Sequence, residues 1–361
     1  MRLGVEAALV DGALVPGDVE LVDGVVGEVA LGRAGKGIAV PGFVDLQVNG
    51  FGGVDFSSTD ANGYRRAGEA LLATGVTAFQ PTLITAPEEN LVAALAEIPE
   101  DGIGPRVLGA HLEGPFISPH ALGAHPAWAR RDPDRQLLER LLAAGRVAHV
   151  TLASERPGAL ELIDLLCERG VVVSLGHSNA TASEAHAGFD RGARTVTHLF
   201  NAMRPFRHRD PGLAGVALAR EDVVVQLILD GHHVADEVAQ IVWRAAPGRV
   251  ALVTDAIEAA GIGDGRYRLG SVDVVVKDGA VRRPDGVLAG SVVTMLESVR
   301  NLHALGAPLA DALAAASSVP ARLTGRGLGR LEPGRPADVL ILDDRLELRG
   351  VFVGGKERVA A

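Results

Sequence analysis

Eight short apolar runs, each long enough for a strand, alternate with segments that have the periodicity of amphipathic helices. The runs cover residues 42–48, 76–84, 107–112, 147–152, 171–175, 195–199, 223–229 and 250–253. The helical patterns lie near residues 60–73, 88–97, 134–144, 158–169, 182–191 and 235–245. Eight strand–helix alternations favour a closed (β/α)8 barrel of the TIM type, an α/β fold, over an open doubly wound sheet.

The two ends of the chain have a different pattern, in which glycine-containing turns separate short apolar runs. Asp11-Gly12 and Asp23-Gly24 are typical of tight hairpin turns, and the same pattern returns near the end of the chain. We therefore expect one small β-sandwich domain built from residues 1–40 and 334–361, with the barrel over residues 41–333. After the eighth strand we also expect a small hairpin over 267–287 and helices over 292–305 and 308–323.

Composition excludes several classes of protein. A net charge of −10 and a pI near 5.6 argue against nucleic acid as a partner, because phosphate binding requires a basic face. The chain has no dinucleotide fingerprint and no P-loop. It has no apolar targeting segment at its start and no run long enough to span a membrane. A single cysteine suits a reducing compartment, so we expect a cytoplasmic protein that binds neither nucleic acid nor membrane.

Residues that can bind a metal occur where three of the predicted strands end. His177 and His198 lie at the ends of the fifth and sixth strands, and Glu113 ends the third. Because the carboxyl ends of barrel strands share one rim, these side chains are expected to meet there. Two imidazoles and one carboxylate are the ligand set of a catalytic zinc site that keeps one position open for water. A lone rim histidine is more often structural, but the three residues together favour a metal site.

Asp255 follows the last predicted strand after four apolar residues. A carboxylate near a metal-bound water is placed to take its proton and to return it to a leaving group. The alternative is that Asp255 caps the N-terminus of a helix. The ligand set does not identify the metal, since two histidines and a glutamate suit zinc, iron, manganese or cobalt.

A barrel with a sandwich from both termini and ligands at these strand ends resembles the amidohydrolase superfamily. More narrowly, several motifs are similar to those of N-acetylglucosamine-6-phosphate deacetylases: HLEGPF, GHSNAT, THLFNAM, DPGLAG, LDGHHV, VTDA and LAGS. The similarity extends from about Pro41 to the end of the chain. It implies metal-dependent hydrolysis of N-acetyl-D-glucosamine 6-phosphate to D-glucosamine 6-phosphate and acetate, in amino-sugar catabolism or cell-wall recycling. A deacetylase of another N-acetylhexosamine phosphate, such as the galactosamine isomer, and a non-catalytic amidohydrolase-like scaffold are the alternatives.

The resemblance assigns the chemistry to five residues. It implies that Glu113, His177 and His198 hold one divalent metal per chain, with zinc as the expected ion and iron, manganese or cobalt as alternatives. It implies that Asp255 is the general base and acid, and that His125 polarises the acetyl carbonyl. Proline directly follows this histidine, whereas the family pattern usually has a residue between the two, so the sequence of this loop departs from the family pattern.

The resemblance also implies a seat for the sugar phosphate. Backbone groups of Asn201 and Ala202 would bind the sugar together with Arg209, and His233 would reach the phosphate from the neighbouring subunit of a homodimer. His232 lies beside His233, and only the match to the family motif selects between them.

Two departures from other superfamily members favour a single metal. Binuclear members open with His-x-His on the first strand, where this chain has Gln47 and Asn49. Many of them also bridge their metals with a carboxylated lysine on the fourth strand, and residues 147–155 contain no lysine. Hydantoinase, dihydroorotase and phosphotriesterase functions would therefore lack a key ligand.

Overall fold

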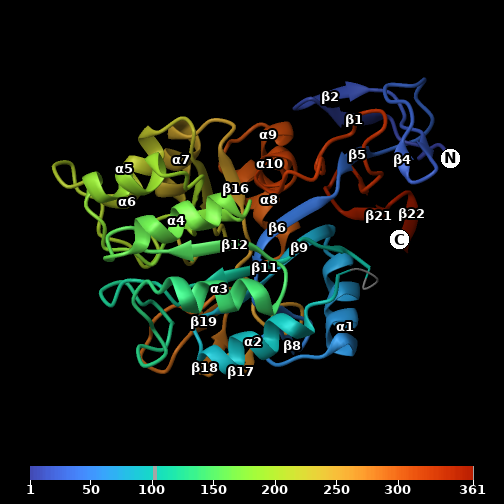
Figure 1. Cartoon of the computed structure of the whole chain (residues 1–361). Coiled ribbons are helices and arrows are strands. Elements are labelled where there is room, and N and C mark those ends of the chain that lie inside the picture. Colours follow the sequence, from blue (N-terminus) through green and yellow to red (C-terminus); the bar gives the residue numbers. More distant parts are fainter. Residues whose placement is uncertain (101–103, 361) are drawn as a thin grey trace.

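The computed structural model, which describes residues 1–100 and 104–360, contains a barrel of eight parallel strands surrounded by helices (Figure 1). Its strands in spatial order are β6 (Phe43–Val48), β9 (Val76–Ile84), β11 (Ala110–Glu113), β12 (Val147–Leu152), β13 (Val172–Leu175), β14 (Thr195–Val196), β15 (Val224–Leu227) and β16 (Val250–Leu252). The short β10 (Arg106–Val107) pairs with β9 ahead of β11, so the predicted third strand is broken into two pieces. The predicted (β/α)8 fold is confirmed.

The barrel closes between its first and last strands. Val48 forms a parallel bridge with Ala256, and the backbone N–H of Asp255 donates to the carbonyl of Gln47 at 2.9 Å. Below this seam the buried Asp45 carboxylate accepts a hydrogen bond of 2.6 Å from the Thr254 hydroxyl. This closure places the ends of β6 and β16 side by side, although about 200 residues separate them along the chain.

The helices of the structure follow the predicted pattern with two differences. They are α1 (Ala61–Leu72), α2 (Glu88–Glu97), α3 (Arg135–Ala144), α4 (Ala159–Glu168), α5 (Ala182–Asp190), α6 (Gly212–Ala219), α7 (Asp236–Ala245), α8 (Met295–Ala304), α9 (Leu309–Ala316) and α10 (Ser318–Thr324). Helix α6 was not predicted, because its sequence GLAGVALA is apolar on every side and has no amphipathic period. The single helix expected over 308–323 is divided, because Ser317 leaves the helical conformation with φ −127° and ψ −81°.

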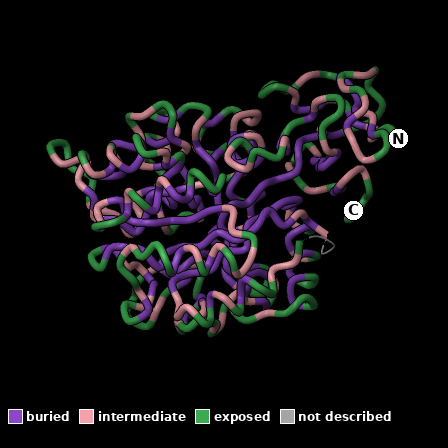
Figure 2. Tube along the Cα trace, in the orientation of Figure 1, coloured by how far each residue is buried: buried purple, intermediate pink, exposed green. Residues whose placement is uncertain are grey.

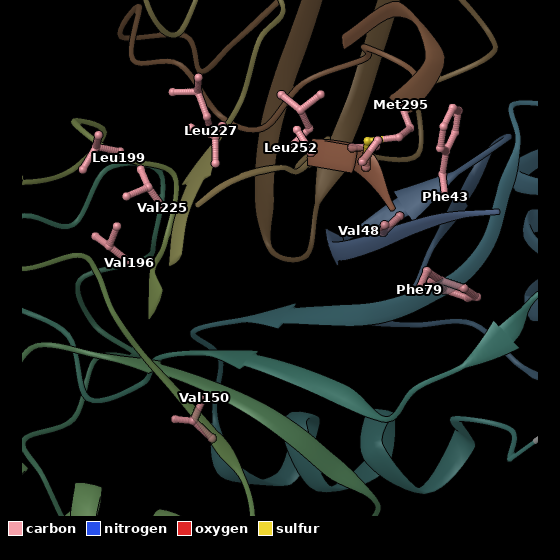
Figure 3. Close-up of a cluster of buried hydrophobic side chains, with 14 of the residues drawn as sticks. Phe43, Val48, Phe79, Val150, Val196, Leu199, Val225, Leu227, Leu252 and Met295 are labelled. Atoms are coloured by element: carbon pink, nitrogen blue, oxygen red, sulfur yellow. The ribbon is translucent and has the colours of Figure 1, made fainter. Parts of the chain in front are cut away.

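The core lies between the barrel strands and the helices. Figure 2 shows the barrel strands as mostly buried, with exposed segments on the outer helices and loops. Apolar side chains such as Phe43, Phe79 and Val150 on the strands pack in one cluster with Met295 at the start of α8 (Figure 3). Burial of each large apolar side chain contributes about 1.5–3 kcal/mol, so this layer holds the strands, and with them the rim, in place.

Inside the barrel, several buried side chains are polar, in contrast to the branched apolar residues usual there. His111 Nε2 lies 2.7 Å from the Thr151 hydroxyl, and His149 Nδ1 lies 3.0 Å from Gln80 Oε1. The two imidazole rings stack with centroids 4.1 Å apart. Burial lowers the pKa of His111 to about 4, so the ring is neutral. This hydrogen-bonded layer lies on β11, which ends at Glu113, and on β12, which pairs with it.

Both termini contribute to a second sheet beside the barrel (Figure 1). Its strands in order are β2 (Ala13–Pro16), β1 (Ala7–Val10), β5 (Ile38–Pro41), β20 (Val339–Leu342), β21 (Leu348–Val353) and β22 (Lys356–Ala360). Antiparallel pairing of β5 with β20 joins the N-terminal and C-terminal segments. The hairpin of β3 (Leu21–Val22) and β4 (Val25–Val26) is a separate two-stranded sheet, which forms a bridge from Val25 to Pro336 of the C-terminal segment. The domain boundaries at residues 40 and 334 stay a prediction.

An insertion after β16 folds over the rim of the barrel. It forms three antiparallel strands rather than the predicted single hairpin: β17 (Gly265–Leu269), β18 (Val272–Lys277) and β19 (Ala280–Arg282). A small hairpin of β7 (Gly50–Phe51) and β8 (Val54–Asp55) follows β6. Among the helices in residues 1–100 and 104–360, none has the length and apolar character needed to cross a membrane.

Candidate active site

A cavity lies at the carboxyl end of the barrel strands, covered on one side by residues 287–290 of the insertion. Its walls come from the loops that follow most of the strands. Eight of the nine predicted site residues line it: Glu113, His125, His177, His198, Asn201, Ala202, His233 and Asp255. The structure therefore brings together nearly all of the predicted site, and Arg209 is the exception.

Glu113, His177 and His198 converge on one point. Glu113 Oε1 lies 3.1 Å from His177 Nε2 and 2.9 Å from His198 Nε2, and the two Nε2 atoms are 3.1 Å apart. All three side chains are buried. Both histidines have positive φ, 46° and 27°, a conformation that costs free energy and is concentrated at functional sites. This backbone conformation ends the strands abruptly and turns both rings into the cavity.

The position of the proton on the His177 ring indicates that this cluster is suited to bind a cation. Its Nδ1 lies 3.0 Å from the carbonyl oxygen of Ala121, which can only accept, so Nδ1 carries the proton and Nε2 has a free lone pair. Burial and the neighbouring His125 lower the pKa of His177 to about 4, which keeps the ring neutral. The Nε2 lone pair then faces a carboxylate oxygen at 3.1 Å. Two such acceptors repel each other unless a cation lies between them, so the donor set fits one bound cation.

The pKa values of Glu113 and His198 depend on the contacts between the two side chains. Burial opposes ionisation of Glu113, but hydrogen bonds from the His125 and His198 rings outweigh it and hold the pKa of the carboxyl well below its usual range. Burial also opposes the charged form of His198, but its hydrogen bond to Glu113 raises the pKa of that ring. A carboxylate is therefore present at neutral pH, as a metal ligand must be.

His125 offers a second possible grouping, since Glu113, His125 and His177 also lie within 4.8 Å of one another. However, His125 Nε2 faces the other carboxylate oxygen, Oε2, at 3.5 Å. His177 and His198 share Oε1 at shorter distances. The geometry thus favours Glu113, His177 and His198 as the ligand set, with His125 beside it.

Asp255 is held next to this cluster by two amide side chains that sequence reasoning treated only as missing ligands. Gln47 Nε2 donates to Asp255 Oδ1 and to Glu113 Oε1, both at 3.0 Å, and Asn49 Nδ2 donates to Asp255 Oδ1 at 2.7 Å. Both residues lie at the end of a predicted strand, which is the signal that could have identified them. Burial, together with the charge of Glu113, raises the pKa of Asp255. The N-cap alternative is wrong, because no helix begins at Asp255 and α8 is capped by Thr294.

His233 lies in the cavity of its own chain. Asp230 Oδ2 lies 2.7 Å from His233 Nδ1, and its Oδ1 accepts the backbone N–H of His233 at 2.9 Å. Both side chains are about 5% exposed. His232 is exposed and is not among the lining residues, so of the two histidines only His233 lines the cavity, and its contact with the phosphate stays a prediction. This position favours the view that His233 serves its own site rather than that of a neighbouring subunit.

Arg209 is exposed on the loop before α6 and does not line the cavity. Arg204 pairs with Asp210 at 2.7 Å and fixes this loop. Within the described part of the chain, neither lysine nor arginine lines the cavity. A phosphate bound there would therefore meet histidine side chains and backbone N–H groups, and no arginine or lysine among the described residues that line the cavity.

Comparison with known proteins relates the chain to hydrolases of one family. Residues 38–358 match the model of the amidohydrolase family. The chain is 41% identical over 339 residues to the N-acetylglucosamine-6-phosphate deacetylase of Bos taurus, covering 88% of this chain and 83% of the relative. It is 35% identical over 360 residues to an N-acetylgalactosamine-6-phosphate deacetylase of Escherichia coli O157:H7, covering 96% of each. The chain also superposes on the structure of a mutant N-acetyl-D-glucosamine-6-phosphate deacetylase of Mycobacterium smegmatis in complex with N-acetyl-D-glucosamine-6-phosphate. The TM-score is 0.94 and the sequence identity is 36%, and the match covers 100% of this chain and 99% of that chain.

Proposed function

The chain belongs to the amidohydrolase family, and from that premise we propose that it hydrolyses N-acetyl-D-glucosamine 6-phosphate to D-glucosamine 6-phosphate and acetate. One observation carries the proposal: the carboxylate of Asp255 is clamped beside the cluster of Glu113, His177 and His198 in a single cavity. The relatives with this activity share about two fifths of their residues with the chain. A non-catalytic scaffold would not need to keep these four side chains together.

We propose Glu113, His177 and His198 as the ligands of one divalent metal, with zinc as the expected ion and iron, manganese or cobalt as alternatives. When bound, such an ion supplies a Lewis acid and lowers the pKa of a coordinated water towards neutrality. Gln47 supports this arrangement, because its amide donates to Glu113 and keeps the carboxylate oriented.

Proton transfer is assigned to Asp255. Its Oδ1 accepts from both Gln47 and Asn49, and no described residue donates to Oδ2, which leaves that oxygen to take a proton. The carboxylate removes a proton from the attacking water as the new C–O bond forms at the acetyl carbon. It then gives this proton to the nitrogen as the C–N bond breaks, releasing acetate and the free amine. His125 is assigned to the acetyl carbonyl oxygen, where a hydrogen bond stabilises the developing negative charge.

The sugar phosphate is assigned to the outer part of the cavity, where Asn201, Ala202 and His233 lie. Because the cavity has no arginine or lysine among the described residues, we propose that Arg209 of a second copy supplies the cation in a homodimer. Arg209 is exposed, so its guanidinium is free to fork onto phosphate oxygens of a neighbouring site. A cytoplasmic location stays part of the proposal, supported by the single cysteine.

Mixed dimers of two different variants test this division between chains. Arg209→Ala and His233→Ala are each expected to raise KM for the 6-phosphate by about tenfold to a hundredfold, since each removes a bond worth about 1.5–3 kcal/mol to a charged group. Co-expressed Asp255→Asn and Arg209→Ala chains should regain a population of sites with the low KM of the wild-type protein, because one site of each mixed dimer then has both Asp255 and Arg209. Asp255→Asn and His233→Ala chains should not.

Arg244→Ala, an exposed arginine on α7, is the matched control and should leave KM unchanged. Rescue by the His233→Ala chain in place of the Arg209→Ala chain would show that His233 and not Arg209 crosses between subunits. A monomer that retains low KM for the phosphate would contradict the proposed dimer.

The activity itself is tested by acetate release from purified protein with N-acetylglucosamine 6-phosphate and with its galactosamine isomer. The galactosamine isomer is included because the relative from Escherichia coli is named an N-acetylgalactosamine-6-phosphate deacetylase. A higher kcat/KM on the glucosamine compound supports the proposal, and the reverse supports the alternative. No acetate from either compound would contradict a deacetylase function.

A further inference from the structure

His125 is held by a residue that lies outside the catalytic cavity. Thr85 follows β9 directly, is about 1% exposed, and does not line the cavity. Its hydroxyl oxygen lies 2.9 Å from His125 Nδ1, and its backbone N–H is directed at the same nitrogen, with N and Nδ1 3.4 Å apart. Both groups of Thr85 therefore meet one ring atom of His125.

These contacts determine where the proton of His125 lies. A backbone N–H can only donate, so Nδ1 must accept and carries no proton in the neutral ring. The hydroxyl of Thr85 lies 2.9 Å from Nδ1 and 3.3 Å from the Glu113 carbonyl, and because the backbone N–H of Thr85 already makes Nδ1 an acceptor, the hydroxyl is the donor in the shorter contact. The proton of neutral His125 is therefore on Nε2, the atom nearer to the Glu113 carboxylate.

The neighbouring His177 has the opposite arrangement. Its Nδ1 donates to the Ala121 carbonyl, which leaves the Nε2 lone pair for a cation. The rings of His125 and His177 lie 4.2 Å apart, so two adjacent imidazoles present different atoms to one cavity. His177 presents an acceptor and His125 presents a donor. The proton position of each ring is fixed by its contact with a group outside the metal-ligand cluster, the Ala121 carbonyl for His177 and Thr85 for His125.

We propose that Thr85 is a positioning residue that fixes the Nε2–H form of His125 and thereby aims a hydrogen-bond donor at the substrate carbonyl. This inference rests on the proposed function for the identity of that carbonyl. A donor fixed in advance needs no reorganisation when charge develops on the oxygen, which is the condition under which such groups are most effective. Without the Thr85 hydroxyl, only the longer backbone contact at 3.4 Å opposes the other tautomer.

The experiment compares Thr85→Val, which removes the hydroxyl at nearly constant volume, with Thr85→Ser, which keeps it. In the wild-type and serine proteins, ¹⁵N chemical shifts of the His125 ring should show protonation at Nε2. In the valine protein they should move towards a mixture of the two forms, and kcat should fall by about tenfold, as expected for one lost hydrogen bond. KM should hardly change. The His125 signals are assigned by their absence in His125→Gln.

Thr77→Val is the matched control, because Thr77 is equally buried on β9 and its hydroxyl donates, among the described residues, to the Phe43 carbonyl at 3.4 Å and not to His125. It should leave both the ring signals and kcat unchanged. An Nε2–H signal that persists fully in Thr85→Val, or in Thr85→Ala if the valine protein fails to fold, would overturn the role of the hydroxyl. So would a loss of kcat that Thr85→Ser shares. Failure of the proposed function would show separately, as wild-type protein with the expected tautomer but no acetate release.

Discussion

Replacing Asp255 by asparagine is expected to lower kcat by about three orders of magnitude or more while the fold and the metal content stay unchanged. An amide can neither accept the proton of the attacking water nor return it to the amine. The fold should persist because the amide oxygen can still accept the hydrogen bonds that Gln47 and Asn49 donate to Oδ1. Acetate release, metal analysis and circular dichroism on the same sample would check all three expectations.

The same variant should change the dependence of the rate on pH. Burial and the charge of Glu113 raise the pKa of Asp255, and a bound cation would lower it again. Because the deprotonated form is the base, kcat/KM of the wild-type protein should fall as the pH drops below this pKa. The residual rate of Asp255→Asn should lack that acid limb. Asp273→Asn, at an exposed aspartate on β18, is the control and should behave as wild type. If Asp255→Asn kept more than about a tenth of kcat, a loss below 1.4 kcal/mol, another group would be the base.

Replacing Glu113 by glutamine should remove both metal and activity. The carboxylate supplies the only negative charge among the three proposed ligands, and its Oε1 contacts both His177 and His198. A glutamine side chain offers one neutral oxygen, and its NH₂ group would face imidazole lone pairs or protons. We expect one metal per chain in the wild-type protein and close to none in the variant, with kcat/KM reduced by about a thousandfold.

Elemental analysis before and after chelation measures this effect, and excess metal should restore activity to chelated wild-type protein but only weakly to the variant. Glu139→Gln, at a partly exposed glutamate on α3, should keep its metal. Two tightly bound metals per wild-type chain would contradict the single-metal site inferred from Gln47 and Asn49 at the end of β6. A Glu113→Gln protein with full metal content would move the site to another set of ligands.

Much of this site follows from the sequence because of one property of barrels. Apolar runs mark the strands, the carboxyl ends of parallel strands share a rim, and the residues just after each run must therefore meet. Glu113, His177, His198 and Asp255 were identified in this way, and the structure places all four in one cavity. The bounds of β9 and β12 agree with the predicted runs to the residue. Strand β14 ends at Val196 and not at Leu199, because the backbone conformation of His198 turns the chain inward.

Other features depended on contacts between segments far apart in the chain. The clamp of Gln47 on Asp255 spans 208 residues and exists only because β16 closes against β6. The choice between His232 and His233 depended on which ring lines the cavity, and the proton on His125 depended on Thr85, 40 residues away. The amphipathic period of a sequence reports which residues are buried, because burial repeats with each turn or each pair of residues. It contains no information on which buried donor meets which acceptor, since that pairing is decided by strand register and by the closure of the barrel.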